Sequence, residues 1–274
     1  MNLDFSFDPL GQSHTNVPAR NVKYWVTVPV RMEFSDELEF DHRDRKDIYD
    51  YIERNGRVNY DEARAALHMD ETAFGHHVAI LRRDGVIERD EDELQLAFDD
   101  AGVEIHAEGD VEFTIRQARE DDRDGLVEAI RSALGDRTYI VGETIADTVD
   151  HEKVLLRHNE VESRVFFLAS VNGEVAGWVH LDHPEVDSLE HTAELTVGVV
   201  PEHRGHDIGT RLLERANEWA RADDYEKLYN SVPATNERGI EWLESHGWET
   251  EAVREDHYRI DDEYVDEVMM AVWP

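Results

Sequence analysis

A short loop, VPEHRGHDIGTRLLERANEW (residues 200–219), carries residue types that can hold a phosphate group. It follows an apolar stretch, has Arg204 at its mouth and runs into a helical pattern. The first turn of a helix presents unpaired N–H groups and a partial positive charge, and both favour a bound pyrophosphate. Small residues such as Gly205 and Gly209 let the backbone approach the ligand closely. The loop therefore predicts an anion site between Arg204 and Thr210.

The elements on either side of the loop must hold it in place. The stretch TAELTVGVV (residues 192–200) is typical of a strand. The helix after the loop gathers its apolar residues on one face, which would anchor it on a sheet: Ile208, Leu212, Ala216, Trp219 and Ala220. A strand, a glycine-bearing loop and an amphipathic helix therefore follow one another.

The same alternation of strands and helices extends over residues 111–274. Strands are predicted at 111–118, 163–171, 174–183, 192–200, 227–234, 248–259 and 264–273, and helices at 123–134, within 142–158, at 208–220 and at 236–247. Asn172-Gly173 is a strong signal for a hairpin turn between the second and third of these strands.

The segment TVGVVPEHRGHDIGTRLL (residues 196–213) resembles the acyl-CoA loop of the GNAT N-acetyltransferases, and so does the element order around it. Arg204 and Gly209 hold the outer positions of that family's signature, while Asp207 stands where its inner Gly is expected. Over residues 111–274 the resemblance implies an α+β fold, a mixed but mostly antiparallel sheet flanked by helices. It also implies acetyl-CoA as cofactor and direct attack of an amine on the thioester.

Family resemblance also assigns cofactor-binding roles. The N–H of Val199 would polarise the thioester carbonyl. Asn236 would contact the pantetheine arm, although capping the helix that follows it is an equally natural role. The complete set of expected cofactor-binding residues is Val199, Arg204, Gly205, His206, Asp207, Ile208, Gly209, Thr210 and Asn236.

A protonated amine must lose its proton before it attacks. Glu194 occupies a position where several relatives carry a catalytic Glu, so it is the first candidate for the base; His191 and Glu190 are weaker ones. The alternative is that Glu194 is an ordinary surface carboxylate. Leu243 stands where many relatives have the Tyr that protonates departing CoA. We therefore consider two other hydroxyls as the catalytic acid, Tyr229 and Tyr258.

Asp207 admits two interpretations. It can cap the helix, and Asp enters the left-handed backbone conformation more readily than most residues. Its carboxylate would also repel pyrophosphate, at a cost of about 1 kcal/mol if exposed and screened. We expect Asp207 to weaken CoA binding without abolishing it.

Residues 43–98 are predicted as helix, helix, helix and hairpin. In the third helix Asp70 is a good N-cap, and Phe74, Val78 and Leu81 form an apolar stripe. The segment FGHHVAILRRDGVIE (residues 74–88) resembles the recognition helix and first wing strand of a winged helix-turn-helix. Residues 1–42 are expected to be an extension with one or two strands, one of them at 23–34, and residues 99–110 a linker.

A winged helix suggests DNA binding, but acidic groups lie where DNA would approach. The third helix begins with Asp70-Glu71, and the wing tip reads RDEDE at residues 89–93. Phosphate contacts need Lys and Arg. Dimerisation, or docking onto the C-terminal domain, is an alternative role for this domain. A transcription regulator that senses acyl-CoA and a non-catalytic GNAT module are the alternatives to the enzyme.

The composition sets the remaining limits. The chain has 64 acidic and 28 basic residues, a net charge of −36, and resembles cytosolic proteins of extreme halophiles; a merely acidic mesophile protein is the alternative. It has no cysteine, and its 15 His residues show no spacing typical of a metal site. The sequence shows no signal peptide and no membrane span, which predicts a cytoplasmic protein.

Overall fold

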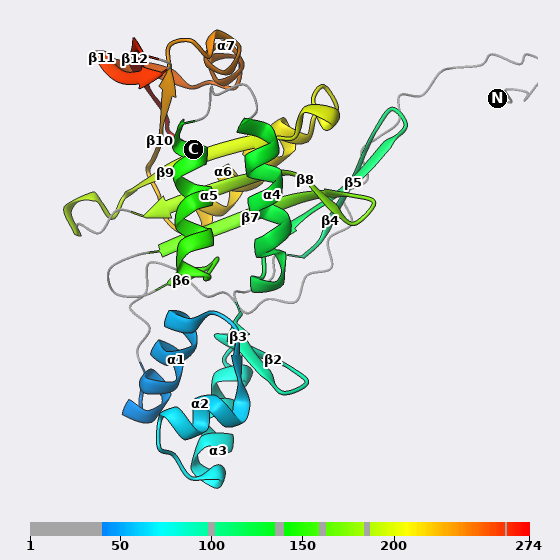
Figure 1. Cartoon of the computed structure of the whole chain (residues 1–274), viewed down its shortest axis with the longest axis vertical. Helices are drawn as coiled ribbons and strands as arrows, with labels where there is room; N and C mark the ends of the chain where they lie inside the picture. Colours follow the sequence, from blue (N-terminus) through cyan, green and yellow to red (C-terminus); the bar gives the residue numbers. More distant parts are fainter. Residues whose placement is uncertain (1–39, 98–101, 135–139, 159–162, 184–186, 261) are drawn as a thin grey trace, which may run out of the picture.

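The computed structural model describes residues 40–97, 102–134, 140–158, 163–183, 187–260 and 262–274. The strand predicted at residues 23–34 lies outside these ranges. Within them, no helix has both the length and the apolar character needed to cross a bilayer. The described residues form a small N-terminal domain and a larger C-terminal one, which lie one below the other in Figure 1.

The N-terminal domain has the three helices and the hairpin in the predicted order, with a two-residue strand between the first two helices that was not predicted. Three helices, α1 (Arg43–Asn55), α2 (Tyr60–Ala66) and α3 (Glu71–Arg83), pack beside a small antiparallel sheet of order β1-β3-β2. The strands are β1 (Val58–Asn59), β2 (Ile87–Asp90) and β3 (Glu93–Leu96). No comparison identifies this domain as a winged helix, so that assignment stays a prediction.

Local signals explain how α3 is bounded and packed. The carboxylate of Asp70 accepts the N–H groups of Thr72 and Ala73, which caps the helix as predicted. Gly85 follows the helix with φ of 78°, a conformation that favours glycine. The predicted stripe of Phe74, Val78 and Leu81 is buried in the domain core.

The C-terminal domain is built on a nine-stranded sheet of order β11-β12-β10-β9-β8-β7-β5-β4, with β6 paired to β7. Its neighbouring strands are antiparallel except β9 and β10, which are parallel. The strands are β4 (Glu104–Glu108), β5 (Val111–Gln117), β6 (Arg157–His158), β7 (Ser163–Val171), β8 (Glu174–His183), β9 (Thr192–Val199), β10 (Lys227–Pro233), β11 (Glu249–Ile260) and β12 (Glu263–Val272). The expected α+β fold with a mixed, mostly antiparallel sheet is confirmed.

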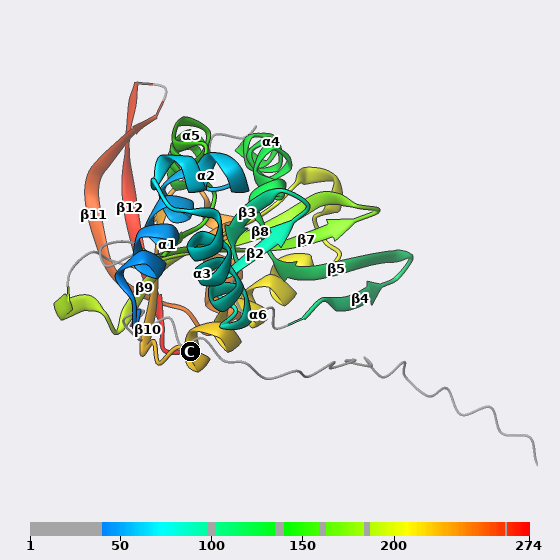
Figure 2. The same cartoon turned by 90° about the horizontal axis from the view of Figure 1, so that it is seen from below.

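Helices cover both faces of this sheet. Figures 1 and 2 show α4 (Arg123–Ala133) and α5 (Ile140–Glu152) on one face and α6 (Ile208–Ala222) on the other. A fourth helix, α7 (Glu237–Ser245), follows β10. Between β7 and β8 the predicted hairpin forms at Asn172 and Gly173, whose φ angles are 53° and 87°.

Strand β4 lies inside the segment that the sequence analysis assigned to a linker. Its alternation is inverted: Val103 and Ile105 are exposed, whereas Glu104 and His106 face inward and contact each other at 2.9 Å. His106 stacks on Phe113 of β5, with the ring centroids 5.2 Å apart. Polar side chains on the inner face concealed this strand, because a strand is recognised by apolar residues there.

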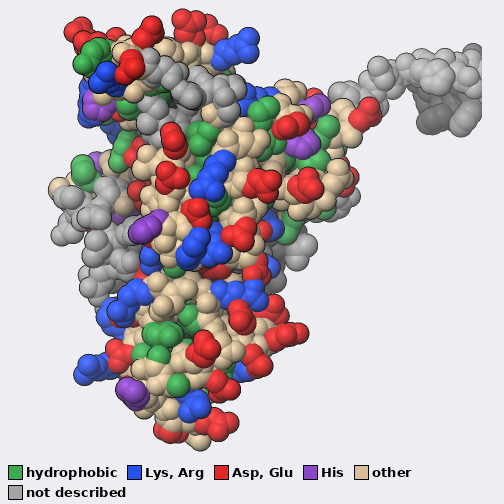
Figure 3. Space-filling model, in the orientation of Figure 1, with side chains coloured by type: hydrophobic (Ala, Val, Ile, Leu, Met, Phe, Trp, Pro, Cys, Tyr) green, Lys and Arg blue, Asp and Glu red, His purple; other side chains and the backbone are tan. Residues whose placement is uncertain are grey.

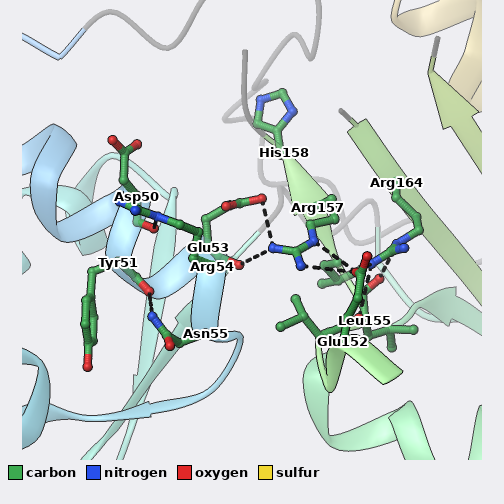
Figure 4. Close-up of polar contacts among 12 residues, drawn as sticks. Asp50, Tyr51, Glu53, Arg54, Asn55, Glu152, Leu155, Arg157, His158 and Arg164 are labelled. Atoms are coloured by element: carbon green, nitrogen blue, oxygen red, sulfur yellow. Dashed lines mark hydrogen bonds and ion pairs between the residues drawn. The ribbon is translucent and has the colours of Figure 1, made fainter. Parts of the chain in front are cut away.

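The two domains are joined through packing and through ion pairs. Buried apolar residues of the N-terminal domain and of α4 and α5 form one continuous cluster. Figure 4 shows the polar part of the contact: Arg157 of β6 lies between Glu53 of α1, at 3.5 Å, and Glu152 of α5, at 3.1 Å. The hydroxyl of Tyr49 donates to the carbonyl of His158 at 2.9 Å. The N-terminal domain is therefore docked on the C-terminal one.

Candidate active site

The central feature of the site is the separation of two parallel strands. β9 and β10 pair only from Lys227 opposite Thr192 to Tyr229 opposite Glu194, and beyond that pair they diverge. The remainder of β9 keeps its ladder with β8, up to Val199 opposite Gly177. Main-chain groups of β9 that face β10 are consequently left without a strand partner beyond Glu194.

Alternation along β9 identifies these groups. Val200, just after β9, donates its N–H to the carbonyl of Ala176 in β8. Because main-chain groups point alternately to the two sides of a strand, the N–H groups of Val199 and Val197 point away from β8 and into the opening. The sequence analysis selected Val199 and missed Val197, although both satisfy the same geometric condition.

Gly198, between them, is required by packing. A Cβ at this position would lie 2.3 Å from the Trp178 ring of β8. The ring therefore fills the space where a side chain of β9 would otherwise stand, on the face of the sheet covered by α4 and α5.

The predicted anion loop begins where β9 ends. A 3₁₀ turn (Pro201–His203) leads to Gly205, with φ of 83°, and to Asp207, which is the N-cap of α6. Asp207 has φ of 61°, so it adopts the left-handed conformation that the family's Gly would adopt easily. Ile208 is the first residue of the helix and is buried, which anchors the first turn of α6.

The carboxylate of Asp207 does not cap the helix. Its Oδ2 lies 3.1 Å from Nε of Arg211, which also pairs with Glu214 at 2.8 Å. The capping role considered for this side chain is therefore wrong; the residue is at the N-cap through its backbone alone. Its charge is offset by a cation one helical turn away.

Arg204 positions the loop. Its Nε donates to the carbonyl of Val199 at 3.0 Å, and its guanidinium also donates to the carbonyl of Ala133 at the end of α4, at 3.3 Å. These bonds tie the loop to β9 and to α4, so the side chain at the mouth of the loop holds main chain.

A cavity of about 1000 Å³ lies over the loop and the opening. Eight of the nine predicted cofactor-binding residues line this cavity, and His206 is not among them. The lining side chains and backbone belong to Glu108, Val197, Gly198, Val199, His203, Arg204, Gly205, Asp207, Ile208, Gly209, Thr210, Thr235, Asn236, Glu237, Arg238, Gly239 and Trp242.

Helix α7 closes the far side of this cavity. Asn236 caps it, accepting the N–H of Gly239 at 3.1 Å. A Cβ on Gly209 would lie 3.3 Å from Trp242, so α6 and α7 approach closely there. The hydroxyl of Thr210 contacts Nε2 of His246 at 3.1 Å, which fixes the first turn of α6 to the end of α7.

The predicted catalytic residues lie on the opposite face of the sheet. Ala193 and Leu195 pack in the core under α6, so Glu194 between them points to the α4 and α5 face. Tyr229 is its register partner on β10. Neither of them, nor Tyr258, lines the cavity over the loop among the described residues. The opening between β9 and β10 therefore lies between the predicted cofactor-binding residues on one face and the predicted catalytic residues on the other.

Electrostatics of this face favour protonated groups. Burial raises the pKa of Glu194, and the nearby charge of Glu267 raises it further. Burial also raises the pKa of Tyr229, with Glu194 contributing. The pKa of Tyr258 is raised by burial and by its hydrogen bond to Glu267. A carboxyl group with a raised pKa and two protonated hydroxyls therefore share one environment.

Sequence reasoning missed Glu267. This residue of β12 is only 4% exposed and accepts the Tyr258 hydroxyl at 3.0 Å. Burial works to raise the pKa of Glu267, but hydrogen bonds from Ser231 and Tyr258, together with nearby positive charge, lower it overall. Arg254, at 2.9 Å, supplies part of that charge. Glu267 therefore stays ionised beside Glu194. Among 64 acidic residues, nothing local distinguished it.

Leu243 and Trp248 belong to the core. Leu243 is 3% exposed and packs with the residues under α6, so its side chain does not reach the opening. Trp248 is 2% exposed, as expected for a core aromatic. Leu243 therefore cannot supply a proton at the opening.

Comparisons with known proteins agree with this geometry. Residues 127–248 match the acetyltransferase (GNAT) family. An uncharacterized N-acetyltransferase of Methanocaldococcus jannaschii is 30% identical over 146 residues, which are 52% of this chain and 62% of that protein. The chain therefore spans less than two thirds of the length of this relative.

Solved structures share the fold. A GNAT-family acetyltransferase of Streptococcus pneumoniae has a TM-score of 0.50 at 21% identity, covering 59% of this chain and 99% of its own. A Staphylococcus aureus N-acetyltransferase has a TM-score of 0.49 at 18% identity, covering 59% and 98%. A Salmonella typhimurium protein solved with acetyl-CoA, its cofactor, has a TM-score of 0.48 at 20% identity, covering 59% and 93%. Residues 127–248 thus match the GNAT acetyltransferase family, and the C-terminal domain shares the fold of a solved member.

Proposed function

We propose that the chain is an acetyl-CoA-dependent N-acetyltransferase that transfers the acetyl group directly to an amine. The observation that supports it most strongly is the divergence of β9 from β10 beyond Glu194, beside a cavity at the start of α6. One ligand can then lie with its diphosphate at the loop and its reactive end at the opening. The acceptor amine reaches the same point from the α4 and α5 face.

The cavity fits a nucleotide thioester. Its volume of about 1000 Å³ is at the upper end of ordinary ligand pockets. Main-chain N–H groups of the first turn of α6 would hold the diphosphate. The cations Arg204 and Arg238 also line it, and Arg211 offsets the charge of Asp207. Asn236 remains available to the pantetheine arm through its side-chain N–H groups.

Distances along β9 divide the roles of its two free N–H groups. At about 3.3 Å per residue, Val197 lies roughly 10 Å along the strand from Glu194, and Val199 roughly 16 Å. The group that polarises the carbonyl must lie nearer the base. We therefore assign the thioester carbonyl to Val197 and the pantetheine arm to Val199.

In the reaction, the amine nitrogen attacks the carbonyl carbon while a main-chain N–H stabilises the developing negative charge. The proton of the amine passes to Glu194 through water, since its raised pKa suits a base at neutral pH. The carbon–sulfur bond then breaks, and CoA leaves as a thiolate or takes a proton. We assign Tyr229 as the acid that protonates the thiolate, because the hydroxyl of Tyr258 already donates a hydrogen bond to Glu267.

Calorimetric titration tests this proposal, run both at low salt and at several molar KCl. Acetyl-CoA is expected to bind, and acetyl-pantetheine, which lacks the nucleotide diphosphate, to bind far more weakly. A panel of small amines, amino-terminal peptides and lysine peptides is then followed for release of free thiol. Binding of acetyl-CoA without turnover of any amine would contradict the proposed N-acetyltransferase activity and favour an acyl-CoA-sensing regulator.

A further inference from the structure

The N-terminal domain brings together three side chains that can bind a metal ion. His42 lies immediately before α1, Asp44 is in its first turn, and His77 lies on α3. One ligand atom from each of them falls within 4.8 Å of the other two. This cluster could not be read from the sequence, because His42 precedes α1, His77 lies on α3, and the two have no motif spacing.

The distances match a small tetrahedral ion. Oδ2 of Asp44 lies 3.7 Å from Nδ1 of His42 and 3.5 Å from Nε2 of His77. Bonds of about 2.0 Å to a tetrahedral Zn²⁺ ion place neighbouring ligand atoms about 3.3 Å apart. Both distances to Asp44 are therefore within a few tenths of an ångström of the tetrahedral spacing, and the ligand nitrogens of His42 and His77 lie within 4.8 Å of each other.

The two histidines of the cluster differ in exposure: His77 is buried, whereas His42 leaves the site open to solvent. His77 is 8% exposed, and its buried Nδ1 has no hydrogen-bond partner among the described residues. His42 is half exposed, so a water molecule can complete the coordination. Its Nδ1 now accepts the N–H of Asp44 at 3.2 Å. Giving up that one cap is a small loss beside the bonds that an ion forms to three ligands.

We propose that His42, Asp44 and His77 bind a divalent transition-metal ion of the zinc class. Two imidazole nitrogens and one carboxylate are a donor set that suits Zn²⁺ or Co²⁺ and disfavours Mg²⁺ or Ca²⁺, which prefer oxygen. The bound ion joins the start of α1 to α3. It stabilises the N-terminal domain, and it acts independently of acetyl transfer.

Titration of the metal-free full chain with Co²⁺ tests the proposal, with Zn²⁺ added in competition. Excess Mg²⁺ in the buffer saturates the many surface carboxylates. One equivalent is expected to bind, with the intense visible absorption of a four-coordinate Co²⁺ ion. Zn²⁺ should displace it and raise the melting temperature.

Variants locate the site. His42→Ala and His77→Ala should each weaken binding by more than the roughly 10–100-fold that follows loss of an outer hydrogen-bond partner. His76→Ala is the matched control, since this exposed neighbour on α3 lies outside the cluster. If His77→Ala does not fold, exposed His42 still decides the question. Absence of tight binding, or equal binding in all three variants, would overturn the proposal.

Discussion

Asp207 and Arg211 form an ion pair across the first turn of α6, with 3.1 Å between Oδ2 and Nε. The pair turns the carboxylate along the helix, and a left-handed backbone at Asp207 leaves the helix start intact. Asp207 thus takes the conformation expected of glycine, at about 1 kcal/mol of strain. It is compatible with an anion site because Arg211 offsets its charge.

Replacing Asp207 by Gly should tighten acetyl-CoA binding several-fold, because it removes the strain and a negative charge near the diphosphate. Asp207→Asn isolates the charge, since it keeps a side chain that tolerates the same conformation. The effect of the charge should shrink in molar salt, where the Debye length is about 3 Å. Calorimetry at two salt concentrations measures both variants. Weaker binding by Asp207→Gly would mean that the carboxylate assists the ligand.

Arg211→Ala should have the opposite effect and weaken acetyl-CoA binding, because it leaves the carboxylate of Asp207 without this cation. The same substitution made in Asp207→Gly should have a much smaller effect. Calorimetric titration of the four proteins forms a double-mutant cycle, which isolates the contribution of the pair. Equal effects of Arg211→Ala in both backgrounds would show that Arg211 acts on the ligand directly.

Glu194→Gln should lower kcat/KM by about 10²- to 10⁴-fold, the usual contribution of a general base. Glu190→Gln, at an exposed position that was a weaker candidate, serves as the control. The active form of Glu194 is the carboxylate, so activity falls as the pH drops through its pKa. Because burial and Glu267 raise that pKa, the acidic limb should lie above the ordinary carboxylate range near 4.3. An unchanged pH profile in Glu194→Gln would remove this residue from the mechanism.

Glu267→Gln should move the acidic limb of the pH profile to lower pH. Removing the negative charge of Glu267 makes it easier to ionise Glu194, so the pKa of Glu194 falls. The amide oxygen can still accept the Tyr258 hydroxyl. Glu263→Gln, at an exposed position of the same strand, should leave the limb in place. A shift to higher pH in Glu267→Gln would contradict the proximity of the two carboxylates.

Much of the fold follows from local sequence patterns. Asn172-Gly173 predicted the hairpin because few other residue pairs adopt both φ angles. The apolar face of α6 predicted its packing, and Ile208, Leu212 and Ala216 are buried as expected. Strand β4 was not predicted, because its inward side chains are polar.

The candidate site was predictable only in part. The loop carries a motif, so most of its lining residues could be named in advance. Glu267 could not be predicted, and neither could the proximity of His42 and His77, because only the folded chain brings these side chains next to their partners. The ion pair of Asp207 with Arg211 could have been predicted, since residues one turn apart on a helix are neighbours.

The docking of the two domains predicts one cooperative unfolding transition for the described chain. Arg157→Ala should lower its stability by about 3 kcal/mol, because Glu53 is 3% exposed and loses a cation. Arg54→Ala is the control, since this exposed neighbour donates within α1, to the carbonyl of Asp50 at 2.9 Å. Urea denaturation in molar KCl, followed by tryptophan fluorescence and circular dichroism, measures both variants. Two separate transitions in the unmodified protein would show that the N-terminal domain unfolds independently, and the shared apolar cluster would then contribute little to stability.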